Sequence, residues 1–347
     1  MRGIRMAAAS MTNPIYTANL FISDGTKYVL KGITTDLVIS CEKNEISEKV
    51  NITFANVKVS GKHIHNNIKL RDKLYVYANT GSGAKEVFRG IVWERDFSFD
   101  DGKKDITLIC YDKLIYLQNS KDNLYVKKGS DTKSVLTNLA KKWGVKISYK
   151  YQSITHEKLV FRNEYIADIF VDILDKVKKK TGVGYVIRCE KGVMIIEAEQ
   201  SNSTVYKIES GDNAISTSYN ETMSGMVTKV QIVKAEKEKK GDKEEETGRY
   251  ITVTNVTGDT SKYGTLQDII EQSADDKLDE AKKEAKQIIS DKGKPEKEIT
   301  VTAVDNPWIK KGHQVYINSG TMKNYYIVKG IEHDATMQEM TLEVRKA

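Results

Sequence analysis

The sequence is poor in cysteine and in proline. Its 347 residues include three cysteines and three prolines. Cys41, Cys110 and Cys189 lie far apart, form no CxxC pair and are odd in number, so neither a disulfide framework nor a zinc cluster is indicated. This pattern is typical of a protein made in a reducing compartment, and a globular composition argues against a disordered or collagen-like chain.

Long hydrophobic runs are also missing. No segment approaches the roughly 18 consecutive apolar residues that a membrane helix requires, so no membrane anchoring is expected. Residues 1–10 are basic and lack the apolar stretch of about 7–15 residues that a secretory signal contains. We expect Met11 to be the natural start and release from the cell to depend on lysis or on a particle.

Charge of one sign does not dominate. The net charge is +7, but 55 basic residues are interleaved with 48 acidic ones along the chain, as on an ordinary solvated surface. The basic residues do not cluster around the 18 tyrosines, which argues against stacking on bases. We therefore expect no specific nucleic-acid binding.

Signatures of catalysis and of metal binding are not found. The chain has no GxSxG, HExxH, P-loop or GxGxxG motif, and Gly81-Ser82-Gly83 is better interpreted as a hairpin turn. His63 and His65 are the closest histidine pair, but no third ligand follows at a familiar spacing. We expect no catalytic residue, no cofactor and no metal, and thus not an enzyme.

Hydrophobic spacing predicts an α+β fold that is mainly β. Alternating apolar residues such as Val50, Ile52 and Phe54 predict a β-domain over residues 12–118. Helical spacing after the cap at Ser130 and Asp131 opens a small α/β domain over residues 119–205. A second β-domain follows over residues 206–347, with an exposed charged loop at 234–247 and a long inserted helix at 265–291.

The two β-domains share short motifs in the same order. Such order predicts one sheet design used twice, with strands kinked at Gly90 and at Gly330. Duplication is useful when a subunit must meet a partner whose rotational symmetry is a multiple of its own. The matched segments are 76–81 with 315–320, 87–91 with 327–331, and 106–110 with 340–344.

Several motifs resemble the XkdQ/YqbQ-like hub proteins of PBSX-type prophages, contractile phage tails and R-type bacteriocins such as diffocins. The resemblance extends from about Ile15 to Val344 and rests on strand and turn patterns. The charged run at 234–247 has no counterpart in that pattern. The motifs that carry the resemblance are Phe88–Val92, Ile106–Leu117, Tyr263–Leu266, Gly312–Ile317 and Tyr326–His333.

The resemblance implies two tube-like β-barrel domains per chain and a homotrimer that presents six of them in a ring. Such a hub joins the sixfold tail tube to the threefold central spike, and its partners are the tube protein, the spike protein, the tape-measure protein and other baseplate proteins. The expected location is the baseplate of a phage or phage-tail-like particle that is made in the bacterial cytoplasm and released by lysis.

Six residues in the repeats are our candidates for subunit contacts: Tyr77, Phe88, Arg89, Tyr316, Val328 and Lys329. Two other functions remain open from the sequence. The domain at 119–205 could make the chain a tail component that binds or hydrolyses cell wall, and the positive balance could support nucleic-acid binding.

Overall fold

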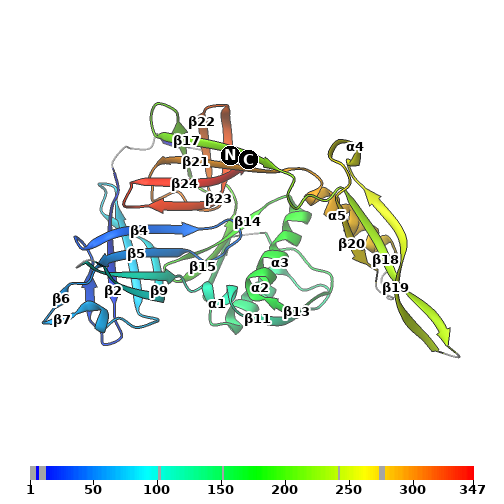
Figure 1. The fold of residues 1–347 in the computed structure, drawn as a ribbon, viewed down its shortest axis with the longest axis horizontal. Helices are drawn as coiled ribbons and strands as arrows, with labels where there is room; N and C mark the ends of the chain where they lie inside the picture. Colours follow the sequence, from blue (N-terminus) through cyan, green and yellow to red (C-terminus); the bar gives the residue numbers. More distant parts are fainter. Residues whose placement is uncertain (1–4, 8–12, 101–102, 151, 241–242, 273–277) are drawn as a thin grey trace. The chain divides into compact units, whose positions relative to one another are not determined.

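The computed structural model describes the chain apart from residues 1–4, 8–12, 101–102, 151, 241–242 and 273–277. Its contacts divide it into two compact units, one of residues 1–218 with 299–347 and one of residues 219–298. The fold is mainly β, as the sequence predicted, with few helices (Figure 1). Among the described residues, none of the helices has the length and apolar character needed to cross a membrane.

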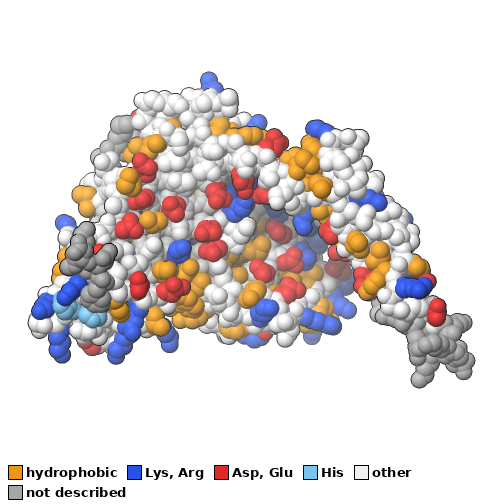
Figure 2. Space-filling model, in the orientation of Figure 1, with side chains coloured by type: hydrophobic (Ala, Val, Ile, Leu, Met, Phe, Trp, Pro, Cys, Tyr) orange, Lys and Arg blue, Asp and Glu red, His pale blue; other side chains and the backbone are white. Residues whose placement is uncertain are grey.

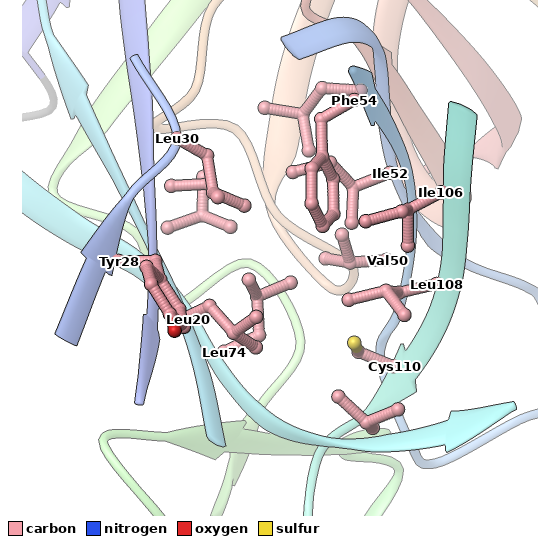
Figure 3. Packing of buried hydrophobic residues seen from close by; sticks show 14 of the residues in the cluster. Leu20, Tyr28, Leu30, Val50, Ile52, Phe54, Leu74, Ile106, Leu108 and Cys110 are labelled. Carbon is pink, nitrogen blue, oxygen red and sulfur yellow. The ribbon is translucent and has the colours of Figure 1, made fainter. Parts of the chain in front are cut away.

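The first β-domain is one antiparallel sheet around an apolar core. Its strands lie in the order β4-β5-β10-β9-β8-β2-β3. Figure 3 shows side chains of this core, including Leu20, Phe54 and Leu108, pointing toward one another from facing strands. The strands are β2 (Ile15–Phe21), β3 (Lys27–Val29), β4 (Thr34–Cys41), β5 (Lys49–Ala55), β8 (Lys73–Asn79), β9 (Ala84–Asp100) and β10 (Lys103–Tyr111), with the short β6 (Lys58–Val59), β7 (Lys62–His63) and η1 (Ile64–Asn66) before β8.

Helices appear in the middle of the chain, where helical spacing predicted them. Asp131 caps α2 by accepting a hydrogen bond from the backbone N–H of Ser134, and Gly182 ends α3 in the left-handed conformation. These predictions are confirmed. The elements are α1 (Ile115–Gln118), β11 (Lys121–Val126), α2 (Thr132–Lys142), β12 (Ile147–Lys150), β13 (Leu159–Tyr165), α3 (Ile166–Thr181), β14 (Tyr185–Glu190) and β15 (Val193–Ala198).

The second β-domain repeats the strand order of the first. Its order is β17-β21-β24-β23-β22-β16-β1, so β21, β24, β23 and β22 correspond to β5, β10, β9 and β8. One difference is that β16 runs parallel to β22, whereas β2 runs antiparallel to β8. The strands are β1 (Arg5–Ala7), β16 (Thr204–Glu209), β17 (Ala214–Thr222), β21 (Glu296–Val304), β22 (Gln314–Ser319), β23 (Met322–Asp334) and β24 (Glu339–Lys346).

The same turn leads into β8 and into β22. The N–H of Arg71 donates to the carbonyl of Val92 at 2.8 Å, and the N–H of Gly312 donates to the carbonyl of Val328 at 2.8 Å. Both donors have a positive φ, 72° and 86°. Arg71 and Gly312 are therefore equivalent, and so are Val92 and Val328. The predicted duplication is confirmed in strand order and in this turn.

The register of the repeat differs from the one that the motifs suggested. A β-bulge follows Val92 in β9 and Val328 in β23, which makes Trp93 equivalent to Lys329. The matching of Gly90 with Gly330 is thus wrong by four residues. Equivalence of Arg71 and Gly312 likewise moves the β8 and β22 match by two residues. Both shifts are an even number of residues, because an alternating strand pattern matches itself after a shift of two or four residues.

Neither β-domain closes into a barrel through the strand pairs of the described residues. In the first domain, β4 and β3 end the order without pairing with each other. Instead, β4 pairs antiparallel with β23 of the second domain, from Cys41 opposite Ile331 to Val38 opposite Asp334. The barrel expectation is corrected: β4 uses its free edge to join the two domains into one continuous sheet (Figure 1).

The second unit, residues 219–298, corrects two further predictions. Of the predicted helix at 265–291, the structure describes α5 from Leu278, while residues 273–277 lie outside the described residues. Residues Gln267–Glu271 form a strand instead, because the edge of β18 accepts them in parallel pairing. The elements are β18 (Lys229–Lys240), β19 (Lys243–Thr257), α4 (Thr260–Tyr263), β20 (Gln267–Glu271) and α5 (Leu278–Lys292).

The charged run at 234–247 is also different from the predicted loop. Apart from residues 241–242, which lie outside the described residues, its backbone lies in the long β18 and β19 hairpin, where Lys237 pairs with Glu246 and Lys239 with Glu244. The core of this unit is a small cluster around Val230, Ile232 and Ala285. The domain boundaries at 118/119 and 205/206 stay predictions.

Candidate functional site

One short segment of the second β-domain contacts both the first β-domain and the α/β domain. This junction segment, residues 305–313, connects β21 to β22. Its first turn forms because the Asn306 side chain accepts a hydrogen bond from the N–H of Trp308 at 3.1 Å. Near its end, Gly312 packs against β14, where an added Cβ would lie 2.5 Å from a methyl carbon of Val186. Only glycine combines this contact with the positive φ.

A buried polar triad links the junction segment to the first β-domain. The hydroxyl of Tyr16 in β2 donates to Asp305 at 2.5 Å, and Nδ1 of His333 lies 2.6 Å from the other carboxylate oxygen. Nε2 of His333 faces the carbonyl of Ile309 at 3.2 Å. Burial and the neighbouring Asp305 raise the pKa of Tyr16, so the phenol remains a donor. Residues 289 positions apart are thereby held together.

The same segment binds the α/β domain through charge-assisted contacts. Arg188 in β14 donates from Nη1 to the carbonyl of Lys311 at 3.0 Å and pairs with Glu197. The ammonium of Lys310 lies 3.2 Å from Glu190. Such bonds are stronger than neutral ones, and partial burial limits their screening by salt. The junction segment therefore bridges three domains with directional contacts.

Two carboxylates of the first β-domain are withdrawn from solvent beside this junction. Asp112 accepts hydrogen bonds from the N–H groups of Leu114 at 2.7 Å and of Glu48 at 2.9 Å, while burial raises its pKa well above the usual range. Burial also raises the pKa of Glu48 to about 7, although Lys310, His333 and Arg188 oppose the shift. A cavity of about 30 Å³ lies here, lined by residues of all three domains.

In the first domain, two of the three candidate contact residues lie on the outer face of the sheet. Arg89 stacks over the ring of Tyr75, 4.4 Å from its centre, and forms a two-point ion pair with Glu86 at 3.0 and 2.6 Å. Tyr77 pairs with Glu86 on the same face. Phe88 is 2% exposed and belongs to the core, so it presents no surface to another chain.

The three candidates in the second domain have different surroundings. Tyr316 packs edge-on against Tyr325, with ring centres 5.2 Å apart. Val328 is 1% exposed and serves the core. Lys329 does not correspond in environment to Arg89, because its ammonium lies 3.7 Å from Glu199 beside the α/β domain. The structure thus brings no pair of candidates from the two repeats together.

Sequence reasoning missed the residues of the junction. Asp305 and Pro307 mark the end of an alternating strand, which is the only local signal available. Nothing in the sequence indicates that Tyr16 contacts Asp305 or that Arg188 contacts Lys311, because those contacts span more than 100 positions. Polar residues after a strand are usually turn residues, and here the turn is also the contact between domains.

Chemistry beyond packing is not indicated at this junction. Within the described part of the chain, no group of three or more potential ligands is arranged to hold a metal ion. His63 and His65 are both hydrogen-bonded to Asn56. Basic and acidic side chains are intermixed over the face of the first unit seen in Figure 2. The arrangement can orient domains.

Solved structures of phage tail proteins share this fold. A tail protein of Neisseria meningitidis is 13% identical, with a TM-score of 0.64 over 95% of this chain and 96% of that one. The 43 kDa tail protein of prophage MuSo2 from Shewanella oneidensis is 15% identical, with a TM-score of 0.62 over 96% of this chain and 98% of that one.

A component of the Escherichia coli type VI secretion system, described as similar to the T4 tail proteins gp27 and gp5, also matches. It is 8% identical, with a TM-score of 0.53 over 94% of this chain and 76% of that one. No curated protein matches the chain by sequence. The model of the YqbQ-like family matches residues 37–345, which include most of both β-domains and the junction segment. The chain therefore belongs to the YqbQ-like family.

Proposed function

We propose that the protein is the hub of a tail baseplate, a trimeric adaptor between the sixfold tail tube and the threefold central spike. Two β-domains of one strand order in a single chain support this proposal, because three such chains supply six similar domains. Membership of the YqbQ-like family and the fold shared with tail proteins point in the same direction.

The observation that carries the proposal is the pairing of β4 with β23 inside the chain. By strand order, the equivalent of β4 in the second domain is β17. The hydrogen bonds agree, because the N–H of Ala55 donates to the carbonyl of Ile33 and the N–H of Val304 donates to the carbonyl of Asn213. The equivalent of the β23 edge is β9 beyond Val92. The contact of β4 with β23 is therefore made within the chain. The equivalent edges, those of β17 and of β9 beyond Val92, are not paired with each other among the described strands.

The exposed side chains along β9 and β17 support the presence of another chain at these edges in the assembled hub. In the paired edge of β23, Ile331 and His333 are each 6% exposed. In β9, residues 94–96 and Ser98 are exposed, and over this stretch β9 pairs only with β10 among the described strands. Along β17, Ile215 is 52% exposed. Unpaired strand edges are sites where another chain adds by backbone hydrogen bonds.

In the proposed trimer, β17 of one subunit pairs with the β9 edge of the next. Six edge contacts then alternate around the ring, three within chains and three between them. Tyr77, Arg89 and Tyr316, on the outer faces of β8, β9 and β22, contact neighbouring baseplate subunits. Replacing Arg89 and Lys329 together with Glu impairs ring assembly, with the larger share from Arg89.

Cysteine cross-linking tests the edge contact. Ser218→Cys in β17 is combined with Asp96→Cys or Ser98→Cys in β9, in a Cys189→Ser background. Oxidation of assembled particles is expected to link different chains. The matched control is Ser40→Cys with Glu332→Cys, which are opposite each other in the β4 and β23 pair and close within one chain. Closure of the control without any link between chains contradicts the edge contact.

Electron microscopy of particles released by lysis tests the hub itself. An antibody against this chain is expected to label the centre of the baseplate, with three copies per particle. Absence of the chain from particles contradicts the proposal. A zymogram with the purified protein addresses the cell-wall alternative, and hydrolysis of peptidoglycan there contradicts a purely structural role.

A further inference from the structure

The loop between β4 and β5, residues 42–48, is held by side chains from outside its own hairpin. The side-chain oxygen of Gln118 accepts hydrogen bonds from the N–H groups of Ile46 at 3.1 Å and of Ser47 at 2.6 Å. Asp112 accepts from the N–H of Glu48 at 2.9 Å. Three N–H donors of this loop thus bond to side chains of the region that follows β10.

Three carbonyl acceptors of the same loop converge on a single nitrogen of the other β-domain. Nζ of Lys311, in the junction segment, donates to the carbonyl oxygens of Glu42 at 2.7 Å, Lys43 at 2.9 Å and Glu45 at 2.5 Å. An ammonium has three N–H donors, so all of them are used. No ion pair of Lys311 with a carboxylate is found within the described part of the chain.

Three carbonyl oxygens around one positive centre are the ligand set that proteins offer to hard cations. A planar guanidinium cannot aim three donors at oxygens that surround a point, which explains a lysine at this position. We propose that the β4–β5 loop is a monovalent-cation site, filled in the intact chain by the ammonium of Lys311, and that this tethered cation holds the first β-domain against the second.

The surroundings of Lys311 agree with a cation that is solvated by carbonyls. Burial lowers the pKa of Lys311, and the neighbouring Lys329 adds to that shift, while Glu45 and Glu343 oppose it. Carbonyl dipoles replace the lost hydration without adding a full negative charge. Close packing fixes the loop as well: an added Cβ on Gly330 would lie 3.1 Å from the nitrogen of Lys43.

The site is also open to a small molecule from one side. A cavity of about 400 Å³, lined by Lys43, Glu45, Lys311 and residues of α3 and β14, lies beside the loop. A small amine can therefore reach the three carbonyls once the lysine side chain is removed. This access makes the proposal testable by chemical rescue.

In the experiment, Lys311→Ala is compared with the unchanged protein by thermal unfolding and by hydrogen exchange of residues 42–48. Loss of three charge-assisted bonds is expected to lower the unfolding midpoint by about 5 °C and to speed exchange in the loop. Propylammonium, which replaces the missing atoms from Cγ to Nζ, is expected to restore both, whereas 1-propanol is not.

Two further variants keep the test decisive. Lys311→Met retains an apolar stem that blocks the site, so it is expected to lose stability without rescue. Lys323→Ala removes an exposed lysine of β23 and controls for general effects of the amine. An unchanged midpoint in Lys311→Ala, or a propylammonium effect no larger than in Lys323→Ala, overturns the proposal. The measurements use the isolated chain, so they stand apart from the hub proposal.

Discussion

The two β-domains share a strand order, an entry turn and a bulge, but they differ in what their connecting segments contact. In the first domain, the segment between β5 and β8 forms the small β6 and β7 hairpin and packs on its own sheet, where Ile64 and Ile68 are buried. In the second, the shorter junction segment reaches the first β-domain and the α/β domain. The same sheet design thus has a connecting segment that packs on its own domain in the first case and one that contacts the other domains in the second.

Equivalent positions in the two domains show how the difference arises. Asn56 and Asp305 both follow the strand next to β10 or β24, and both are 6% exposed. Asn56 bonds His65 within its own domain, whereas Asp305 bonds Tyr16 of the other domain and His333. A neutral amide suffices for a local turn, and a charged acceptor with two partners fixes a contact between domains.

The largest expected effect comes from breaking this pair of positions. Asp305→Ala leaves the Tyr16 hydroxyl and the imidazole of His333 buried without their partner, and we expect a loss of about 3–5 kcal/mol in the free energy of unfolding. Asn56→Ala removes only neutral hydrogen bonds, with an expected loss of about 1–2 kcal/mol. Urea unfolding of both variants measures the difference. Equal losses contradict the special role of the junction.

A second prediction concerns close packing around Gly90 in the first domain. At Gly90, an added Cβ would lie 2.4 Å from the carbonyl oxygen of Tyr111 and 2.4 Å from the ring of Phe88. Because a backbone atom is in the way, Gly90→Ala is expected to cost about 2–3 kcal/mol. Ser82→Ala in the exposed turn of the same hairpin is the control and should change stability by less than about 0.5 kcal/mol.

The turns that lead into β8 and β22 are expected to differ in how their contribution to stability changes at acid pH. His313 accepts the N–H of Lys310 at 3.2 Å, as Asp72 accepts that of Lys69 at 2.7 Å in the first domain. Burial, with Arg188 and Lys310 nearby, lowers the pKa of His313 to about 3. The unfolded chain then binds more protons below about pH 6.5, so stability falls as the pH falls, by about 2 kcal/mol between pH 7 and pH 5.

The variant His313→Asp gives the second domain the acceptor of the first. Its carboxylate keeps the bond to the N–H of Lys310 and faces two cations, so the loss of stability should move to lower pH. Thermal unfolding between pH 4 and pH 8 measures the shift. An unchanged pH profile shows that His313 is not the group responsible.

A second pH effect has the opposite sign and belongs to the first domain. Burial raises the pKa of Glu48 to about 7. The folded chain binds more protons than the unfolded one between about pH 4.5 and pH 7, so this group lowers stability as the pH rises through that window. Glu48→Gln should remove a loss of about 3 kcal/mol at pH 8 and leave stability at pH 4.5 nearly unchanged.

Much of the local structure could be predicted from the sequence. The helices α2 and α3 and the hairpin of β14 and β15 follow from apolar spacing, a cap at Asp131 and the turn at Lys191 and Gly192, all of which act over a few residues. The strand β20 could not be predicted, because Ile269 and Ile270 fit a helical stripe as well as a strand, and the edge of β18 decided between them.

The sequence by itself determined the mainly β character of the fold, the existence of a repeat and the positions of α2 and α3. Only the tertiary structure decided the register of that repeat, the pairing of β4 with β23 and the contacts of the junction segment. The physical reason is periodicity: a strand pattern repeats every two residues and matches itself after any even shift. Hydrogen bonds between strands and between domains, such as the one from Tyr16 to Asp305, select one register from these alternatives.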